Sequence, residues 1–365
     1  APMNEEELIA QGEDPKDPGG YFIINGTERV IVNIEDLASN RMFVEANKIG
    51  TSMFTAKIFS EKGSYRVPHA IEQTKDGLMH LSFTRFKKLP IMILIHALGL
   101  LKDNEIVEHI SKEREFDDVF TNLVEAAEFN SQDDALEEIG RRMGINQPKE
   151  IKIEKVKDNF DRYLLPHLGT DPKDRVYKAI NLCKLIKRFL LTSKEFMHTQ
   201  DKDHYKNKRL KLSGDLLADL FRTNLRALVN DILYNFQRLV KRGKFHSVKI
   251  IIRDKLLTSR INSAMATGVW VGGRKGLSQN IQRTNFLDTT SHLQRVVSLL
   301  SATQENFAAR ALHPTHWGRL CCIETPEGTP IGLRKNLAIL AEVTQDDVQE
   351  VKIIKSLEGL GIKND

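Results

Sequence analysis

The chain has 365 residues and a formal net charge of +5, with 41% of its residues hydrophobic and 28% charged. This length exceeds that of one hydrophobic core, so two or more domains are expected, and the composition excludes a disordered or fibrous protein. The start is acidic and polar, unlike a targeting peptide, and the longest apolar run (residues 89–101) is too short for a bilayer. Three cysteines are too few and too unevenly placed for a disulfide framework, which predicts a reducing, cytoplasmic location.

The first ninety residues are predicted to be rich in β-strands. Two β-prone runs, residues 21–24 and 29–33, flank Asn25-Gly26, a pair typical of the type I′ turn of a β-hairpin. Short alternating runs predict further strands within residues 42–46, 53–61, 65–71 and 78–86. We therefore expect antiparallel strands near the beginning of a separate unit.

Beyond this region the chain is predicted to become helical. Pro90 begins an apolar helix, residues 103–140 form acidic helical segments, and residues 173–196 carry apolar residues at helical spacing. The polar, turn-rich stretch 197–209 is the best candidate for a domain boundary.

The clearest helix follows this boundary. Its apolar stripe runs from Leu216 to Val240 at spacings of three and four, with Ser213 as the expected N-cap and Gly243 as the expected stop. We expect the stripe to have a structural role first.

Positive charge is concentrated in residues 201–340, which hold 23 Lys and Arg against 10 Asp and Glu. From Thr267 onward the sequence is also rich in Arg, Gln, Asn and Thr. Such asymmetry indicates a surface that faces a polyanion, although a basic face that only maintains solubility is the alternative.

The stretch HPTHWGRLCCIETPEG, residues 313–328, has the highest density of chemically active side chains. Structural zinc sites use two ligand pairs that each straddle the ion, and the spacing of His313, His316, Cys321 and Cys322 does not supply them. A cysteine nucleophile beside a histidine stays conceivable, but neither cysteine lies in a known catalytic signature.

The sequence gives only weak support for a phosphate-binding loop or for a two-metal phosphoryl-transfer site. The segment 272–276 is glycine-rich and basic but lacks the Lys-Ser/Thr ending of a P-loop. Two-metal phosphoryl transfer needs clustered carboxylates, and within residues 255–345 the closest pair, Glu324 and Glu327, flanks a proline turn. We therefore interpret the basic segment as a nucleic-acid-binding surface, in which Arg and Lys neutralise phosphates and amides add hydrogen bonds. Its basic residues are Arg274, Lys275, Arg283, Arg295, Arg310, Arg319, Arg334 and Lys335.

Four stretches occur in order along the chain: DPGGYFIINGTERV, DKDHYKNKRLKLSGDLLADLFR, GGRKGLSQ with TSHLQRV, and HPTHWGRLCCIETPEGTPIGLRKNLA. They resemble consecutive signatures of the second-largest subunit of multisubunit DNA-directed RNA polymerases. The sequences of these stretches are closer to the archaeal and eukaryotic subunits than to the bacterial β subunit. The resemblance covers essentially the whole chain and implies an archaeal subunit of the B″ type, or a fragment of one.

The resemblance implies an α+β, multidomain fold of mixed antiparallel sheets with helices. A discontinuous protrusion domain would contain an inserted lobe, and a fork would follow. Residues 21–45 would then pack on the helix at 216–240. The implied domains are 1–46 (protrusion, first part), 47–200 (lobe), 201–258 (protrusion, second part), 259–342 (fork) and 343–365 (start of the external region).

The resemblance also implies residue roles. Gln279 and Arg295 fall on RNA-proximal positions of the stretch that lines the rifamycin pocket in the bacterial subunit. Arg319 and Glu324 fall on positions that approach the RNA 3′ end and the incoming nucleotide. The nucleic-acid-binding residues implied together by charge and resemblance are Arg274, Lys275, Gln279, Arg295, Arg310, Arg319 and Glu324.

Two positions depart from the family pattern. Gln282 stands where the bacterial pattern has Asp, which puts rifamycin sensitivity in doubt. Cys322 stands where Pro is usual, so the turn before Ile323 is expected to differ locally.

The implied function is that of a polymerase subunit that helps to form the DNA/RNA channel and active-centre cleft in transcription and is inactive in isolation. Nucleotidyltransferase activity would belong to the assembly, with no cofactor in this chain and Mg²⁺ held by the largest subunit. The implied partners are the largest subunit, the remaining B portion, template DNA, nascent RNA and general transcription factors, with no membrane. Two alternatives stay open: a scaffold module that docks factors or subunits without touching nucleic acid, and a free-standing enzyme with its own metal site.

Overall fold

The computed structural model describes residues 4–47, 52–63, 65–111, 116–129, 131–243, 251–270, 274–303, 305–344 and 350–360, and the structural statements below concern these residues. The chain divides into two compact units. We call residues 21–280 the central unit, and residues 1–20 together with residues 281–365 the terminal unit.

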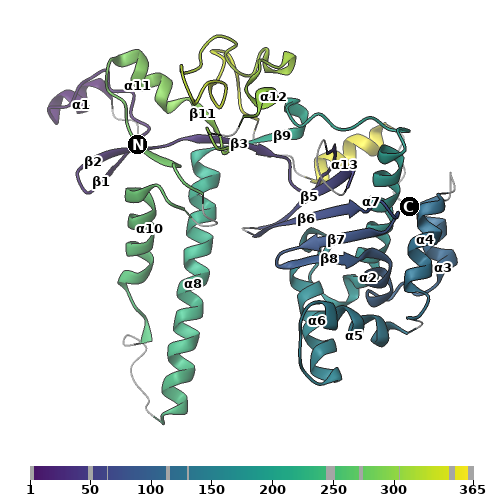
Figure 1. Ribbon diagram of the computed structural model, residues 1–365. Coiled ribbons are helices and arrows are strands. Elements are labelled where there is room, and N and C mark those ends of the chain that lie inside the picture. Colours follow the sequence, from purple (N-terminus) through teal and green to yellow (C-terminus); the bar gives the residue numbers. More distant parts are fainter. Residues whose placement is uncertain are drawn as a thin grey trace. The chain divides into compact units, whose positions relative to one another are not determined.

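The largest sheet of the central unit has five antiparallel strands in the order β4-β5-β6-β7-β8 (Figure 1). Along β6 the buried residues Val67, His69 and Ile71 alternate with more exposed ones, because successive side chains of a strand point to opposite faces. The strands confirm the predicted β-rich segment, and the last predicted run is a pair of strands. Their bounds are β4 Met42–Ala46, β5 Phe54–Lys62, β6 Tyr65–Gln73, β7 Met79–Phe83 and β8 Phe86–Pro90.

Six α-helices share one hydrophobic core with this sheet (Figure 1). Every residue of α2 is buried, and Pro90, predicted to begin the helix, is the N-cap directly before it. The helix predicted at 173–196 is confirmed as α7, whereas α6 was not among the predicted elements. The bounds are α2 Ile91–Ala97, α3 Asp103–Ser111, α4 Asp117–Ala126, α5 Gln132–Arg142, α6 Lys149–Tyr163 and α7 Arg175–Ser193, with short 3-10 helices η1 Pro166–Leu168 and η2 Pro172–Asp174.

The predicted hairpin at Asn25-Gly26 is confirmed. Asn25 (φ 51°) and Gly26 (φ 77°) both lie in the left-handed region that a type I′ turn requires. The hairpin strands form a three-stranded sheet in the order β1-β2-β10, and β3 pairs antiparallel with β9. The bounds are β1 Phe22–Ile24, β2 Thr27–Ile31, β3 Asn33–Leu37, β9 Lys208–Lys211 (after the 3-10 helix η3, Tyr205–Asn207) and β10 Ser278–Asn280.

The long helix α8, Ser213–Lys241, begins one residue earlier than predicted. Ser213 is the first helical residue and Leu212 is the N-cap, so the N-cap prediction is wrong by one position. The Leu212 backbone N–H donates to Asp215 Oδ2 at 3.1 Å, so an acidic side chain of the first turn accepts the N–H of the N-cap residue. Gly243 (φ 64°) follows the helix end and confirms the predicted stop.

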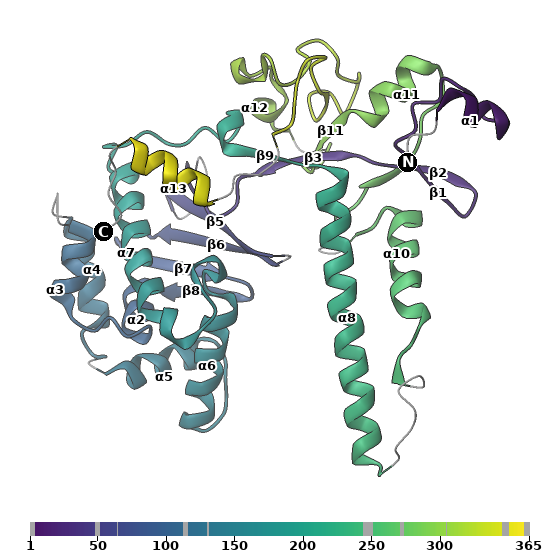
Figure 2. The ribbon, with the colours of Figure 1, turned by 180° about the vertical axis from the view of Figure 1, so that it is seen from behind.

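The apolar stripe of α8 is buried over its first turns only. Leu216 and Leu220 form a small core with Ile31 and Ile34 of β2 and β3 and with Met265 of α10, Lys255–Thr267. Figures 1 and 2 show α10 running beside α8. Further along α8 the stripe is about half-exposed within the described residues, with Leu225 at 40%, Val229 at 48%, Leu233 at 52% and Phe236 at 50%.

The terminal unit has short elements joined by long loops. Strands β11 and β12 pair antiparallel, with Arg295 opposite Asn336 and Val297 opposite Arg334. The bounds are α1 Glu5–Ala10, α11 Phe286–Leu293, β11 Arg295–Ser298, α12 Phe307–Arg310, the 3-10 helix η5 Pro314–His316, β12 Arg334–Asn336 and α13 Glu350–Gly359.

The α+β fold class with mainly antiparallel strands is confirmed. In the part of the chain that the structure describes, we find no helix with the length and hydrophobicity of a membrane span.

Candidate nucleic-acid interface

Residues 313–328, the chemically dense stretch, are tied to strand β12 by backbone hydrogen bonds. The Cys321 N–H donates to the Asn336 carbonyl at 2.9 Å, and the Ala338 N–H donates to the Arg319 carbonyl at 3.1 Å. Arg319 therefore has a fixed backbone, while its side chain is exposed and donates from Nη1 to the Thr315 carbonyl at 3.2 Å. No ion pair of Arg319 occurs among the described residues, so its charge is available to an external anion.

Glu324 is held from both its backbone and its side chain. Its backbone N–H donates to Cys321 Sγ at 3.4 Å, and its carboxylate accepts a hydrogen bond of 2.5 Å from Ser291 Oγ on α11. The turn that follows is fixed by the Thr325 hydroxyl, which donates to the Arg334 carbonyl at 3.0 Å and accepts the Gly332 N–H at 2.9 Å. Glu324 is exposed, so a fixed carboxylate is presented to solvent.

Arg295 lies in a half-buried cluster of cationic side chains. Its Nη1 donates to Gln282 Oε1 at 3.0 Å, and the Gln282 backbone N–H donates to His292 Nδ1 at 3.1 Å. Burial lowers the pKa of Arg295, and the neighbouring Arg334 lowers it further. Burial, with Arg295 and Arg334, lowers the pKa of His292 to about 4, so His292 is neutral at pH 7. The cluster disfavours positive charge and would be relieved by a bound anion.

Arg310 organises the loop around it. Its guanidinium donates to the carbonyls of Thr329 (2.6 Å), Ile331 (3.0 Å) and Ala302 (2.7 Å). These bonds use several of the five guanidinium donors to shape the protein itself.

The remaining three candidates lie in the central unit. Arg274 is half-buried and its Nη2 lies 3.6 Å from Asp36 Oδ2, a carboxylate that also binds Arg66. Lys275 is exposed, and Gln279 on β10 donates from Nε2 to the Gly276 carbonyl at 2.9 Å. Part of the predicted glycine-rich segment, residues 272–273, lies outside the described residues.

The structure thus groups Arg295, Arg319 and Glu324 with Arg310 in the terminal unit. Ser291 and His292 hydrogen-bond to Glu324 and Gln282, respectively, and were not among the site residues predicted from the sequence. A serine and a histidine on a short helix carry no signal of this role, because their partners are distant in sequence.

The histidines and cysteines for which a zinc site was considered, and disfavoured by their spacing, form no metal-binding group among the described residues. His313 Nδ1 accepts the Thr315 N–H at 3.2 Å, and its ring centroid lies 6.1 Å from that of His316. Within the described ranges no group of three or more His, Cys, Asp or Glu side chains could hold a metal ion.

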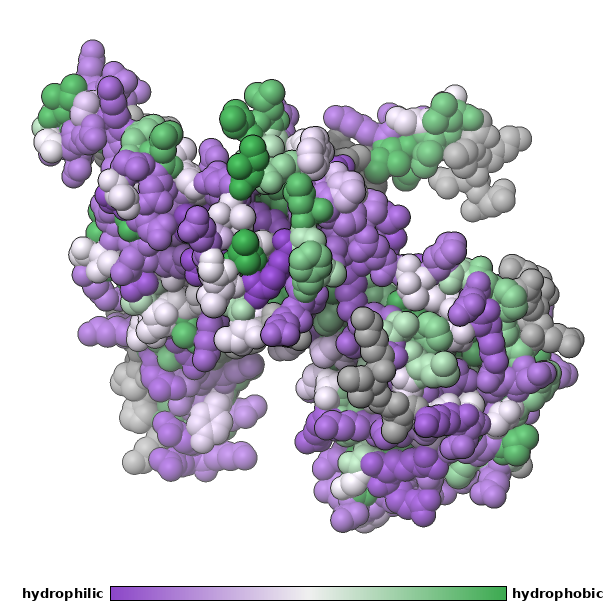
Figure 3. Space-filling model, turned by 45° about the horizontal axis from the view of Figure 1, so that its top comes forward, coloured by the Kyte–Doolittle hydropathy of each residue, from purple (hydrophilic) through white to green (hydrophobic). Residues whose placement is uncertain are grey.

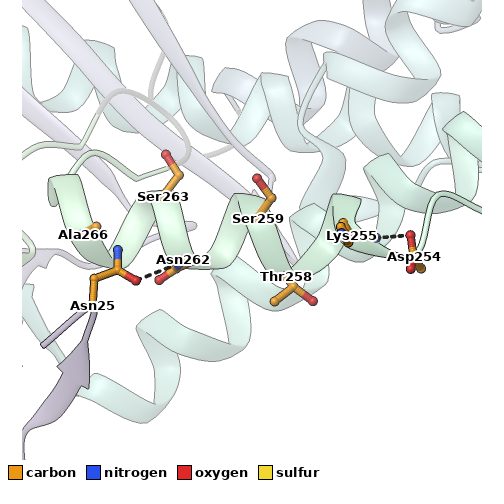
Figure 4. A pocket seen from close by; sticks show the side chains of 8 residues that line it. All are labelled: Asn25, Asp254, Lys255, Thr258, Ser259, Asn262, Ser263 and Ala266. Atoms are coloured by element: carbon orange, nitrogen blue, oxygen red, sulfur yellow. Dashed lines mark hydrogen bonds between the residues drawn. The ribbon is translucent and has the colours of Figure 1, made fainter.

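A shallow groove in the central unit runs along the polar face of α10 (Figure 4). Asn262 Nδ2 donates to Asn25 Oδ1 at 3.4 Å across one end of it. Hydroxyl and amide groups dominate its lining: Asn25, Asp254, Lys255, Thr258, Ser259, Asn262, Ser263 and Ala266. It contains no candidate from the sequence.

Comparison with known families places this architecture in a class of polymerase subunits. RNA polymerase Rpb2, domain 2, matches residues 28–211, and RNA polymerase Rpb2, domain 3, matches residues 279–343. The first match covers about half of the chain, and the second contains all the candidate residues of the terminal unit.

Individual relatives of the chain belong to the same class of polymerase subunits. The chain is 47% identical over 360 residues to DNA-directed RNA polymerase subunit Rpo2 of Saccharolobus solfataricus, covering 98% of this chain and 32% of that protein. It is 42% identical to subunit Rpo2N of Halobacterium salinarum, covering 99% of this chain and 70% of the relative. For subunit Rpo2N of Methanococcus vannielii the identity is 44%, with 99% and 74% covered. The chain belongs to the archaeal Rpo2N family of second subunits of DNA-directed RNA polymerase, and it spans about a third of the undivided Rpo2 relatives.

Proposed function

We propose that this chain forms part of the DNA/RNA channel and active-centre cleft of a DNA-directed RNA polymerase and has no catalytic activity alone. The observation that carries the proposal is the pair of cations Arg295 and Arg334, in the same unit as the exposed Arg319. Burial and the neighbouring Arg334 lower the pKa of Arg295, and a phosphate against this half-buried site would stabilise its charged form.

The contribution of this chain to nucleotidyl transfer would be alignment. Arg295 and Arg319 would hold phosphates of the transcript, and Glu324, fixed by Ser291, would accept hydrogen bonds from ribose hydroxyls or base edges. Within the central unit, the donors Arg274, Lys275 and Gln279 would make further contacts to nucleic acid. Mg²⁺ would be held by the largest subunit, and the transfer step belongs to the assembly.

We also propose the domain division given by the resemblance. The core shared by Ile31 and Ile34 with Leu216 and Leu220 supports a protrusion whose two parts, 1–46 and 201–258, flank an inserted lobe at 47–200. Residues 259–342 would form the fork and residues 343–365 the start of the external region.

Partners of this chain would include the largest subunit, the remaining B portion, general transcription factors and nucleic acid, in the cytoplasm. The terminal unit exposes large apolar residues: Ile339 is 100% exposed, Leu340 93%, Ile323 90% and Phe307 85%. Apolar side chains also stand out from the mainly hydrophilic face in Figure 3. Exposed apolar surface supports contact with other subunits. The same feature favours a second candidate, a scaffold that docks proteins without touching nucleic acid.

Charge reversal at Arg319 separates the two candidates. In polymerase assembled with Arg319→Glu, we expect elongation complexes to dissociate faster and the salt dependence of their stability to fall by about one phosphate contact. Lys75→Glu, at an exposed turn between β6 and β7, is the matched control and should leave both quantities unchanged. Normal elongation by Arg319→Glu, together with impaired assembly, would favour the scaffold.

A further inference from the structure

Cys321 and Cys322 are adjacent, free and each partly exposed. They lie in the loop that leads to Glu324, and the proposed contacts to nucleic acid use neither thiol. The third cysteine, Cys183 on α7, is fully buried, and burial raises its pKa to about 12. Oxidants and thiol reagents react with accessible thiolates, so the three cysteines differ sharply in expected reactivity.

Both neighbouring thiols have defined contacts. Cys321 Sγ accepts the backbone N–H of Glu324 at 3.4 Å, and Cys322 Sγ donates to the Leu320 carbonyl at 3.8 Å. The first contact links the redox state of this pair to the backbone of a candidate site residue.

We propose that Cys321 and Cys322 form a redox-active vicinal dithiol, which hydrogen peroxide converts to a disulfide that displaces Glu324. One thiolate attacks the O–O bond, giving a sulfenic acid and hydroxide. The neighbouring thiol then attacks the sulfenic sulfur, so that the S–S bond forms, the S–O bond breaks and a second hydroxide leaves. The two thiol protons convert both hydroxides to water, and the two sulfurs supply the two electrons that reduce the peroxide.

Ring closure requires the backbone to move. The peptide bond holds adjacent Cα atoms about 3.8 Å apart in the trans form, closer than the roughly 4.4–6.8 Å that disulfides usually span. An S–S bond between neighbours is therefore accommodated by changes in the dihedral angles and peptide planes around the pair. The residues before the pair are anchored, since the Cys321 N–H donates to Asn336 and Leu320 forms a β-bridge with Leu337.

Ile323, directly after the pair, is less restrained than the residues on either side of it. Ile323 is 90% exposed, so its side chain makes few contacts that oppose movement. Oxidation of Cys321 to a disulfide would also change the hydrogen bond that its sulfur accepts from the Glu324 N–H. Closure is therefore expected to shift Glu324 and break its 2.5 Å hydrogen bond with Ser291. This functional consequence, unlike the disulfide itself, rests on the proposed function.

Mass spectrometry tests the chemistry. Trypsin cleaves after Arg319 and Arg334, so both cysteines lie in one peptide, residues 320–334, with no other cleavage site. In peroxide-treated full chain this peptide should be two hydrogen masses lighter, and dithiothreitol should reverse the change. Cys322→Ser should abolish it, whereas Cys183→Ser should leave it intact. A peptide that stays reduced, two separate sulfinic acids, or disulfides between chains would each overturn the proposal.

Transcription tests the consequence. In assembled polymerase, peroxide should slow elongation reversibly in the wild type and in Cys183→Ser, but not in Cys322→Ser. If the disulfide forms and elongation is unchanged, the coupling to Glu324 is refuted. The proposed function does not depend on that result, because the Arg319→Glu comparison tests it separately.

Discussion

Lys178 on α7 is a buried cation whose removal should change the pH dependence of stability. Its side chain is 0% exposed, and Nζ donates to the carbonyls of Phe160 at 2.8 Å and Asp161 at 3.1 Å. Burial is the largest cause that lowers the pKa of Lys178 from 10.5 to about 8, although the Asp161 and Asp174 carboxylates oppose it.

The lowered pKa fixes the sign of the effect. Between the folded and unfolded pKa values, the unfolded chain binds more protons at this site than the folded chain does. Stability therefore rises with pH through the window from about 8 to 10.5. Between pH 7 and pH 9.5 the gain from Lys178 is about 2 kcal/mol, an order-of-magnitude figure. Lys178→Met removes this gain, so the wild type should become more stable relative to the variant as pH increases.

Cys183, buried on the same helix, reports unfolding of this core. We would measure the fraction of Cys183 labelled in a saturating thiol pulse across a urea series at pH 7, 8.5 and 9.5, in a Cys321→Ser, Cys322→Ser background. Lys184→Met is the matched control, because Lys184 is exposed on the same helix. The reasoning is refuted if the stability difference between wild type and Lys178→Met is constant across this range, or if it changes in the opposite direction.

Two further predictions concern packing and backbone conformation. Leu216→Ala should lower the free energy of unfolding by about 2–5 kcal/mol in urea denaturation, because Leu216 is only 1% exposed. Leu233→Ala, at a position 52% exposed, should lower it by less than about 1 kcal/mol, and equal losses would contradict the burial assigned to α8. Gly332→Ala should increase amide hydrogen exchange in the terminal unit, because a Cβ there would lie 2.3 Å from the Arg310 carbonyl oxygen at a φ of +71°; Gly328→Ala shares the positive φ (+78°) without a close neighbour and should have the smaller effect.

Local patterns predicted most of the central unit's elements. The Asn25-Gly26 hairpin and the strands β4 to β8 follow from alternation and turn residues, which act over a few positions. Helix α6 is different: its buried residues are Val156, Phe160 and Asp161, too few to form a stripe that the sequence displays. The exposure of Leu225 to Phe236 on α8 could not be predicted either, since periodicity identifies an apolar face and not what covers it.

The candidate site was predictable by residue type and charge but not by geometry. Excess cations and the family resemblance select Arg295, Arg319 and Glu324 from the sequence. The supporting contacts, from Ser291 to Glu324 and from Gln282 to Arg295, join side chains far apart in the chain. Such pairs depend on which loops fold together, and no propensity or spacing encodes that.

Asn336 contacts the groups that position both Arg295 and Glu324. Its side chain is buried at 5% exposure, and its Oδ1 lies 3.3 Å from Ser291 Oγ, the group that holds Glu324. Its carbonyl accepts the Cys321 N–H, and its register partner in β11 is Arg295. Asn336 thus lies beside the backbone of Arg295, the hydroxyl that orients Glu324 and the backbone of Cys321. A shared support of this kind holds a cation and a carboxylate in fixed relation, as the alignment role proposed above would require.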